Sequence, residues 1–257
     1  MRFSGKAAIV TGAASGLGRA IAQRLASEGA AVVIADANEP HAGLARDEIA
    51  AAGGRAIAVR ADVTRPGDVA AMVAATLAEY RRLDILVSNA GIGGMHPFLH
   101  ETLEHWNRVL AVNLTGVFLC GQAAAQVMRN AGAGRIVNVA SVSGERAGSG
   151  RTAYGTSKAG VIQLTRQMAL ELGPLGITVN AVAPGPVDTP LVMADHTPDT
   201  RAAYNRMIPL GRYGTPAEIA GAVAYLASDD AAYVNGHTLS VDGGFLAAGM
   251  IAHDVAG

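Results

Sequence analysis

The chain is predicted to form an α/β fold with a doubly wound parallel sheet. Short apolar runs alternate with segments of helical spacing along its 257 residues. Each short run is continuously apolar, as expected of strands that are covered on both faces. Strand followed by helix, repeated, is typical of a parallel sheet with helices on both sides. We therefore expect about seven strands in a single domain spanning residues 1–257.

The expected strands are Ala7–Val10, Ala31–Ala35, Ala56–Val59, Ile85–Val87, Arg135–Val139, Thr178–Val182 and Thr238–Val241. The expected helices are Gly16–Glu28, Ala42–Ala52, Pro66–Tyr80, Leu103–Arg129, Ala153–Leu172 and Pro216–Ala227. Residues 189–213 break this alternation, with three prolines and no strand pattern. Because a long insertion late in such a fold often covers the ligand crevice, we expect a substrate lid there.

Composition excludes several classes of protein. Half of the residues are hydrophobic and 16% are charged, which excludes a disordered chain. A net charge of -1 gives no reason to expect nucleic acid or an anionic membrane as partner. The one cysteine, Cys120, cannot form an internal disulfide. The first six residues lack the apolar segment of a signal peptide, so we expect a cytoplasmic protein.

The stretch Val109–Met128 carries no charged residue and is long enough to suggest a membrane span. It contains Asn113, Gln122 and Gln126, whose amides would be costly in lipid. We therefore expect a buried helix and no membrane association. Because the stretch is uncharged on all sides, more than a one-sided surface helix requires, it also favours an oligomer.

A glycine-rich loop, Thr11 to Gly18, follows the first expected strand and opens the first helix. In that context Gly12 allows a tight turn, Gly16 lets the backbone approach a pyrophosphate, and Gly18 lets helix and strand pack closely. The phosphate would lie at the N-terminus of the helix. The spacing G-x3-G-x-G differs from the common G-x-G-x-x-G, so a plain turn is the alternative to a Rossmann-type dinucleotide site.

Asp36 ends the second expected strand. A carboxylate there can accept hydrogen bonds from the hydroxyls of an adenosine ribose and would repel a 2′-phosphate. Neither Ser15 nor Ala37 offers a cation to hold such a phosphate. NAD is therefore favoured over NADP. The alternative is that Asp36 only caps the helix near Pro40.

Tyr154 and Lys158 are four residues apart in an expected helix, so their side chains project from one face. A lysine ammonium close to a phenol favours the phenolate and lowers the tyrosine pKa from about 10. Such a tyrosine can give or take a proton near neutrality. The alternative is an exposed helical Tyr–Lys pair.

The glycine loop and the Tyr154–Lys158 pair, together with further motifs, occur along the chain in the order found in the short-chain dehydrogenase/reductase family. The sequence resembles that family from Lys6 to the Val241–Gly244 segment. Ser141 precedes Tyr154 by the interval typical of that family. One departure is Ser88, where many members have a second asparagine before the Asn89-Ala90-Gly91 motif. The motifs that carry the resemblance are Thr11–Gly18, Asp62-Val63, Asn89-Ala90-Gly91, Asn113, Ser141, Tyr154-x3-Lys158 and Pro184-Gly185.

The resemblance implies a catalytic role for four residues. Tyr154 would be the general acid or base, and Lys158 would lower its pKa and hold the nicotinamide ribose. Ser141 would hydrogen-bond the reacting oxygen, and Asn113 would anchor a water that links Lys158 to solvent.

The resemblance also implies how the cofactor is bound. Asp62 and Val63 would meet the adenine. The remaining cofactor residues would be Gly12, Ser15, Gly16, Leu17 and Gly18 of the loop, Asn89, Ala90 and Gly91 in the cleft, and Pro184, Gly185, Val187 and Thr189 at the nicotinamide.

The expected function is reversible NAD-linked oxidation of a secondary alcohol, such as a polyol or sugar, to its ketone. The alternative is a 3-oxoacyl-(acyl-carrier-protein) reductase that uses NADPH. A catalytically idle dinucleotide sensor would lack one of the four catalytic residues, and all four are present. The resemblance further implies a homotetramer.

Other polar residues give weaker indications. The histidines at 96, 100 and 105, with Glu101 and Glu104, lack the H-E-x-x-H spacing of a zinc site, so we expect no metal there. His96 follows Gly93-Gly94-Met95 and could edge the substrate pocket. Substrate contacts are left open for five residues, namely His96, Arg146, Arg151, Arg201 and Arg206.

Overall fold

The computed structural model describes residues 1–249, so the end of the expected domain, residues 250–257, lies outside the described residues. Within the described range a parallel sheet of seven strands runs in the order β3-β2-β1-β4-β5-β6-β7. This confirms the predicted doubly wound sheet. The strands are β1 Ala7–Thr11, β2 Ala31–Asp36, β3 Arg55–Arg60, β4 Ile85–Ser88, β5 Gly134–Val139, β6 Ile177–Pro184 and β7 Thr238–Val241.

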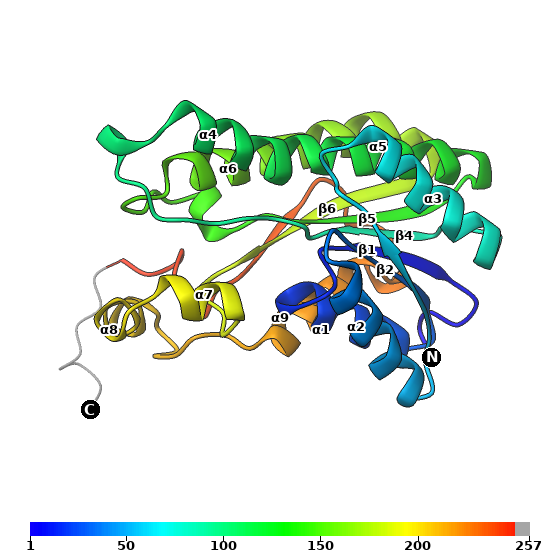
Figure 1. Cartoon of the computed structure of the whole chain (residues 1–257), viewed down its shortest axis with the longest axis horizontal. Coiled ribbons are helices and arrows are strands. Elements are labelled where there is room, and N and C mark those ends of the chain that lie inside the picture. The colour runs from blue at the N-terminus through cyan, green and yellow to red at the C-terminus, as the bar shows by residue number, and fades with distance from the viewer. Residues whose placement is uncertain (250–257) are drawn as a thin grey trace.

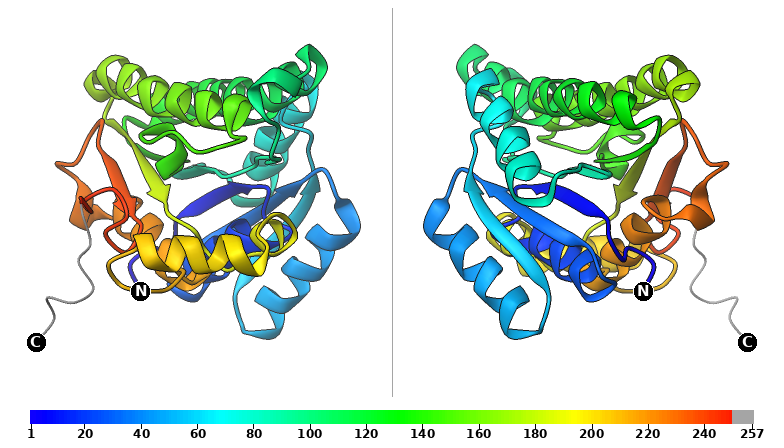
Figure 2. Two further views of the ribbon diagram at one scale, coloured as in Figure 1. Left: turned by 90° about the vertical axis from the view of Figure 1, so that its left-hand side faces the viewer. Right: turned by 90° about the vertical axis from the view of Figure 1, so that its right-hand side faces the viewer.

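Helices cover both faces of the sheet (Figures 1 and 2). One face carries α1 (Gly16–Ser27), α2 (Glu39–Ala51) and α9 (Pro216–Leu226). The opposite face carries α3 (Pro66–Tyr80), α4 (Leu103–Leu110), α5 (Gly116–Ala131) and α6 (Thr152–Leu172). In Figure 1 the yellow helices α7 (Pro190–Asp195) and α8 (Pro198–Met207) lie together at one end of the molecule.

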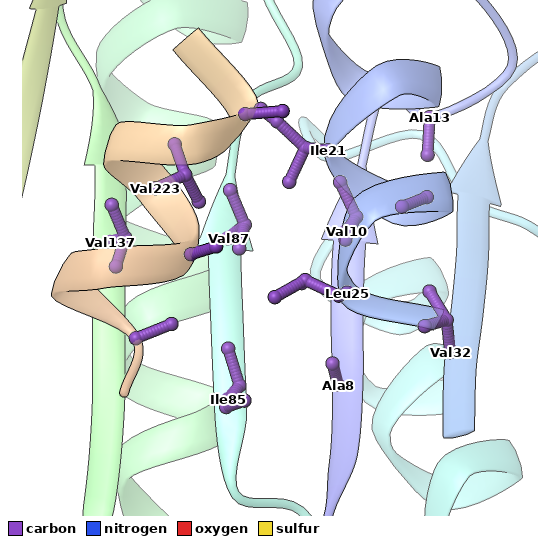
Figure 3. Packing of buried hydrophobic residues seen from close by; sticks show 14 of the residues in the cluster. Ala8, Val10, Ala13, Ile21, Leu25, Val32, Ile85, Val87, Val137 and Val223 are labelled. Carbon is purple, nitrogen blue, oxygen red and sulfur yellow. The ribbon is translucent and has the colours of Figure 1, made fainter. Parts of the chain in front are cut away.

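The core under α1 and α9 shows why these segments become helices. Ile21 and Leu25 recur at helical spacing on α1 and are fully buried. Figure 3 shows them facing β1 and β4 beside Val223 of α9. Because Ala, Val, Ile and Leu fill this layer apart from Phe3, the helices can approach the sheet closely, which fits a chain in which 4% of the residues are aromatic.

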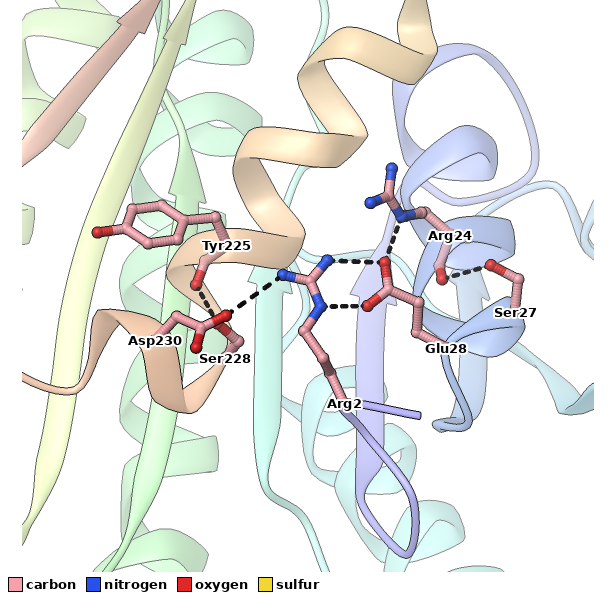
Figure 4. Close-up of polar contacts among 7 residues, drawn as sticks. All are labelled: Arg2, Arg24, Ser27, Glu28, Tyr225, Ser228 and Asp230. Carbon is pink, nitrogen blue, oxygen red and sulfur yellow. Dashed lines mark hydrogen bonds and ion pairs between the residues drawn. The ribbon is translucent and has the colours of Figure 1, made fainter.

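The end of α1 is tied to the start of the chain by ion pairs (Figure 4). Glu28 accepts two hydrogen bonds from Arg2, at 2.5 and 2.8 Å, and a third from Arg24. The hydrogen bond from Arg2 is the main cause that lowers the pKa of Glu28 to about 2, against a smaller opposing effect of burial. Arg2 also lies 3.8 Å from Asp230. These charges connect the first residues with α1 and with the turn that follows α9.

The expected helix 103–129 is continuous but contains one wide turn. Residues Ala111–Thr115 are π-helical between α4 and α5. A π-helical turn inserts one extra residue into the helical repeat, and such turns are frequent at functional sites. The stretch Leu103–Ala131 is the one described helix that is long and apolar enough to cross a membrane, and 44% of its apolar window is buried. A helix in the core of a soluble protein also meets this criterion of length and hydropathy.

The expected lid, 189–213, is more regular than its prolines suggest. Pro190 and Pro198 each stand at the first position of a short helix, where a missing N–H costs nothing. Thr189 and Thr197 cap these helices by accepting hydrogen bonds from Val192 N and Thr200 N. Residues 189–213 therefore contain α7 and α8 rather than an irregular loop. Their role as a lid stays a prediction.

Candidate active site

The carboxyl ends of the strands border a cavity of about 720 Å³. The strand order reverses between β1 and β4, which is where ligands bind in doubly wound sheets. Every residue predicted to bind the cofactor lines this cavity, and Ser141 does too. The predicted lining residues are Gly12, Ser15, Gly16, Leu17, Gly18, Asp36, Asp62, Val63, Asn89, Ala90, Gly91, Tyr154, Lys158, Pro184, Gly185, Val187 and Thr189.

The glycine loop packs its backbone directly against neighbouring backbone. Gly12 has a φ of +64°, and a Cβ at that position would lie 2.7 Å from the Cα of Ala90. A Cβ on Gly18 would overlap the carbonyl oxygen of Gly12 and lie 2.5 Å from Nδ2 of Asn89. Gly16 differs, because a Cβ there would have its nearest neighbouring atoms 3.8 Å away. That is ordinary van der Waals contact, so glycine is favoured at position 16 by its φ of +53° rather than by a close approach of the protein backbone.

The N-terminus of α1 offers an anion site. Ser15 is the N-cap residue, yet its side chain makes no capping hydrogen bond, and the first turn contains no acidic residue. Gly16, Leu17 and Gly18 of that turn line the cavity. Backbone N–H groups and the helix dipole at such an end favour a phosphate. A dinucleotide pyrophosphate therefore fits the residues present.

Asn89 fastens the glycine loop to the end of β4. Its Nδ2 donates to the carbonyl oxygens of Thr11, at 2.9 Å, and of Gly12, at 3.1 Å. In return Thr11 Oγ1 accepts from the backbone N–H groups of Asn89 and Ala90, at 3.0 and 3.1 Å. Asn89 thus positions the loop in addition to lining the cavity.

Asp36 faces the cavity from the end of β2. Its Oδ2 accepts from Ala14 N at 3.0 Å and its Oδ1 accepts from Asn38 N at 2.9 Å. The cap of α2 is Asn38, which accepts from His41 N, so Asp36 is not the helix cap. A carboxylate has about four lone-pair directions, which leaves acceptor capacity for a ribose hydroxyl.

Asp62 lines the same cavity just after β3, the strand that pairs with β2. Its Oδ1 accepts from the hydroxyl of Thr64 at 2.7 Å and from Thr64 N at 3.0 Å. These hydrogen bonds, the hydroxyl first, lower the pKa of the Asp62 carboxyl against a smaller effect of burial. Thr64 was missed by the sequence analysis, although a threonine two residues after an aspartate is typical of an Asx-type turn.

Lys158 is 4% exposed, and its Nζ donates a 2.8 Å hydrogen bond to the carbonyl oxygen of Val139 at the end of β5. Burial lowers the pKa of this lysine to about 8. The Nζ lies 5.8 Å from the ring centroid of Tyr154, one helical turn earlier on α6. A Cβ on Gly91 would lie 3.6 Å from the Nζ, in ordinary contact, and 3.3 Å from Oδ1 of Asn113. The alternative of an exposed Tyr–Lys pair is thus excluded for Lys158.

Ser141 lies next to this pair, directly after β5, and is 7% exposed. Its Oγ accepts a 3.1 Å hydrogen bond from Ser143 N. Because the amide occupies a lone pair of the oxygen, the hydroxyl proton of Ser141 remains to donate. The hydroxyl lines the same cavity as Tyr154 and Lys158.

Asn113 lies behind the cavity, in the π-helical turn, and is fully buried. Its Oδ1 accepts from Ile92 N at 2.8 Å, and its Nδ2 donates to Ile92 O at 2.9 Å and to Ser157 Oγ at 3.2 Å. These contacts join the segment after β4 to α6. The side chain of Asn113 therefore positions both walls of the site, and the water that it is expected to anchor stays a prediction.

Residues 185–189 connect the end of β6 to α7. Gly185 N donates to Val241 O at 3.0 Å, and a Cβ on Gly185 would lie 2.8 Å from the Cα of Asp242. Pro190 and Val192 of α7 join Thr189 in lining the cavity. The first helix of the expected lid is therefore part of the cavity wall.

Aromatic and basic side chains connect the expected lid to the start of α6. His196 Nδ1 lies 2.9 Å from the hydroxyl of Tyr213, and its Nε2 lies 3.1 Å from Nη2 of Arg151. The guanidinium of Arg151 is 5.5 Å from the ring centroid of Tyr154. Arg201 pairs with Asp188 at 2.6 Å. These contacts hold α7 and α8 close to the residue expected to transfer the proton.

Substrate contact was also left open for Arg146, Arg206 and His96, and these three residues lie in different parts of the structure. Arg146 donates to Phe245 O at 3.4 Å and stacks on the Phe245 ring, whereas Arg206 is exposed on α8. His96 is not among the residues that line the cavity. It lies beside Glu101 and His105, so the fold brings together three potential metal ligands that the sequence spacing did not favour.

A sequence model described as enoyl-(acyl carrier protein) reductase matches residues 12–246 of the chain. Cis-4-hydroxycyclohexanecarboxylate dehydrogenase of Sinomonas cyclohexanicum is 48% identical over 95% of this chain and 98% of its own length. A 3-oxoacyl-(acyl-carrier-protein) reductase of Synechocystis sp. is 43% identical, again over 95% of this chain and 98% of its own.

The fold is also similar to solved structures. A 7α-hydroxysteroid dehydrogenase in complex with NADH and 7-oxo glycochenodeoxycholic acid superimposes with a TM-score of 0.92. It is 37% identical, and the match covers 95% of each chain.

The Gly18→Ala substitution is expected to weaken NADH binding by at least about ten-fold, because the methyl group displaces the Gly12 carbonyl and distorts the phosphate loop. Fluorescence titration with NADH measures the dissociation constant. Gly67→Ala is the matched control, since nothing lies within 4 Å of its added Cβ. Unchanged affinity in correctly folded Gly18→Ala would contradict the assigned role of the loop.

Proposed function

The chain belongs to the short-chain dehydrogenase/reductase family, and on that premise we propose that it interconverts a secondary alcohol and its ketone with NAD as cofactor. Its relatives are oxidoreductases that act on CH–OH groups, and the family uses a nicotinamide cofactor. The observation that carries the proposal is the buried Lys158, held by Val139 O beside Tyr154 at the edge of the cavity.

Tyr154 is proposed to transfer the proton. In the direction of oxidation its phenolate accepts the proton of the substrate hydroxyl, and in reduction its hydroxyl returns that proton to the carbonyl oxygen. A cation nearby favours the phenolate, and burial strengthens this effect because water screens the charge less. Lys158 is the buried cation close to the ring.

Ser141 is proposed to orient the substrate oxygen. Its Oγ is fixed by Ser143 N, so its proton can donate to the reacting oxygen in either direction of the reaction. The nicotinamide ring, when bound, supplies the hydride acceptor or donor. The residues at the end of β6, including Gly185 and Thr189, would hold that ring against the site.

The preference for NAD is proposed from Asp36. Its carboxylate is at the cavity wall, fixed by Ala14 N and Asn38 N, where it can accept from a ribose hydroxyl. A 2′-phosphate would bring negative charge against this carboxylate. The neighbouring lining residues Ser15 and Ala37 carry no charge to compensate.

A hydroxyl on a carbocyclic ring is the proposed substrate class. Two similar proteins are named for a hydroxycyclohexane acid and a hydroxysteroid. The second candidate function is reduction of a 3-oxoacyl thioester with NADPH, which the similarity to the Synechocystis reductase favours. Asp36 separates the two, because the second candidate requires a site for the 2′-phosphate.

Assembly as a homotetramer is proposed from the resemblance to the family. Helices α5 and α6 pack on the same face of the sheet and expose Phe118 and Leu170, which are 44% and 73% exposed.

The cofactor preference is tested by initial rates on ring alcohols, polyols, hydroxy acids and a 3-oxoacyl thioester, with NAD(H) and NADP(H) side by side. The wild-type chain should prefer NAD(H) and ring alcohols. Asp36→Asn keeps an acceptor oxygen but removes the charge, so the ratio of kcat/KM for NAD to that for NADP should fall at least about ten-fold. Asp47→Asn, on the exposed side of α2, should leave the ratio unchanged. A wild-type preference for NADPH and the thioester would overturn the proposal.

Replacing Tyr154 by Phe removes the transferred proton and keeps the ring, so kcat/KM should fall by about 10²–10⁴-fold. Affinity for NADH, measured by fluorescence titration, should remain within about two-fold, because the glycine loop is untouched. Tyr225→Phe on α9 is the control and should keep wild-type rates. Appreciable turnover in Tyr154→Phe would show that another group carries the proton.

A further inference from the structure

We propose that His96 and His105, with Glu101 behind them, form a binding site for a first-row divalent transition metal such as Zn²⁺. The site lies between β4 and α4, outside the residues that line the cofactor cavity. It does not depend on the proposed function. His96, Glu101 and His105 are neither sequential neighbours nor spaced as H-E-x-x-H, and the path of the chain brings their ligand atoms within 4.8 Å of one another.

Glu101 fixes one of the two imidazoles. Its Oε1 lies 2.6 Å from Nδ1 of His105, and the two side chains are 9% and 21% exposed. A carboxylate at this distance holds the proton on Nδ1, which leaves the Nε2 lone pair of His105 to bind a cation. Metal-binding histidines almost always carry such a carboxylate or carbonyl on the other nitrogen.

His96 supplies the second nitrogen. Its ring stacks on His105 with the centroids 3.8 Å apart and an angle of 22° between the planes. The backbone N of His96 donates to Gly150 O at 2.9 Å, which fixes the residue independently of its ring. Because the lone pair of an imidazole lies in the ring plane, binding one ion to both rings requires the His96 ring to turn out of this stack.

Gly94 lies beside both nitrogens. Its φ is +143°, and a Cβ there would lie 3.2 Å from Nε2 of His105 and 3.7 Å from Nε2 of His96. The two Nε2 atoms therefore border one spot that a side chain at position 94 would fill. A residue other than glycine would also be strained at this φ.

The donor set indicates the class of metal. Imidazole nitrogens suit Zn²⁺, Co²⁺, Ni²⁺ and Cu²⁺, whereas Ca²⁺ and Mg²⁺ require sets of oxygen ligands. Two protein nitrogens leave the other coordination positions to water, so the ion would exchange with solvent, unlike the closed site of a structural zinc. Bound metal would join the first turn of α4 to the segment that pairs with Gly150, next to Arg151.

Trp106, the one tryptophan of the chain, follows His105 and reports on the site. The test titrates Ni²⁺ into the full chain, with any affinity tag removed, and follows quenching of Trp106 fluorescence. Equilibrium dialysis with Zn²⁺ gives the stoichiometry. Saturable quenching and one bound zinc per chain are expected, and absence of either overturns the proposal.

Variants assign the ligands. His96→Ala and His105→Ala should each weaken metal binding at least about ten-fold, and Glu101→Gln should weaken it about 10–100-fold through the orientation of His105. His41→Ala and His100→Ala, two exposed histidines, should bind as the wild type does. Circular dichroism verifies that each variant is folded.

Co²⁺ absorption provides a readout that does not depend on stability. Bound Co²⁺ should show visible d–d bands, and these bands should shift in the His96→Asn variant. Asparagine keeps a polar side chain at this position, so His96→Asn is a milder substitution than His96→Ala. Binding that survives in both His96 variants and in folded His105→Ala would place the metal elsewhere and overturn the proposal.

Discussion

The burial of the Lys158 ammonium at the carboxyl edge of the sheet is the constraint on which the rest of the site depends. Removing a charge from water costs several kcal/mol unless polar groups replace the lost hydration. Here the Val139 carbonyl replaces part of the lost hydration of the ammonium. This carbonyl is available because β5 ends at Val139. Helix α6 carries Tyr154 and Lys158 on one face.

A second network makes the walls of the cavity behave as one unit. Asn89 holds the glycine loop after β1 to the end of β4, and Asn113 holds the next segment of that connection to α6. Asn89 bonds backbone carbonyls, and Asn113 bonds the backbone of Ile92 and the hydroxyl of Ser157, so the two sides of the reversal in strand order are fixed by hydrogen bonds between different elements. The phosphate loop and the Tyr154 helix are thereby placed relative to each other.

Much of the fold and the cavity could be predicted from the sequence because those features have local signatures. Continuous apolar runs predicted the seven strands, and Gly12 and Gly18 of the first loop mark close backbone approaches that the structure contains. The Val139 carbonyl was missed because a backbone atom has no sequence signature. The π-helical turn at Asn113 depends on tertiary packing. The meeting of His96 with His105 depends on the path of the connection between β4 and α4. Local sequence patterns encode neither.

The burial of Lys158 can be measured directly, since the chain has two lysines, Lys6 and Lys158. Lysine labelled with ¹³C at Cε gives two NMR signals, and Lys158→Met assigns them. We predict that the Lys158 signal titrates with a pKa of about 8 in the cofactor-free protein. Titration at the value of a lysine in water, about 10.4, would show a solvated ammonium and contradict the burial of Lys158.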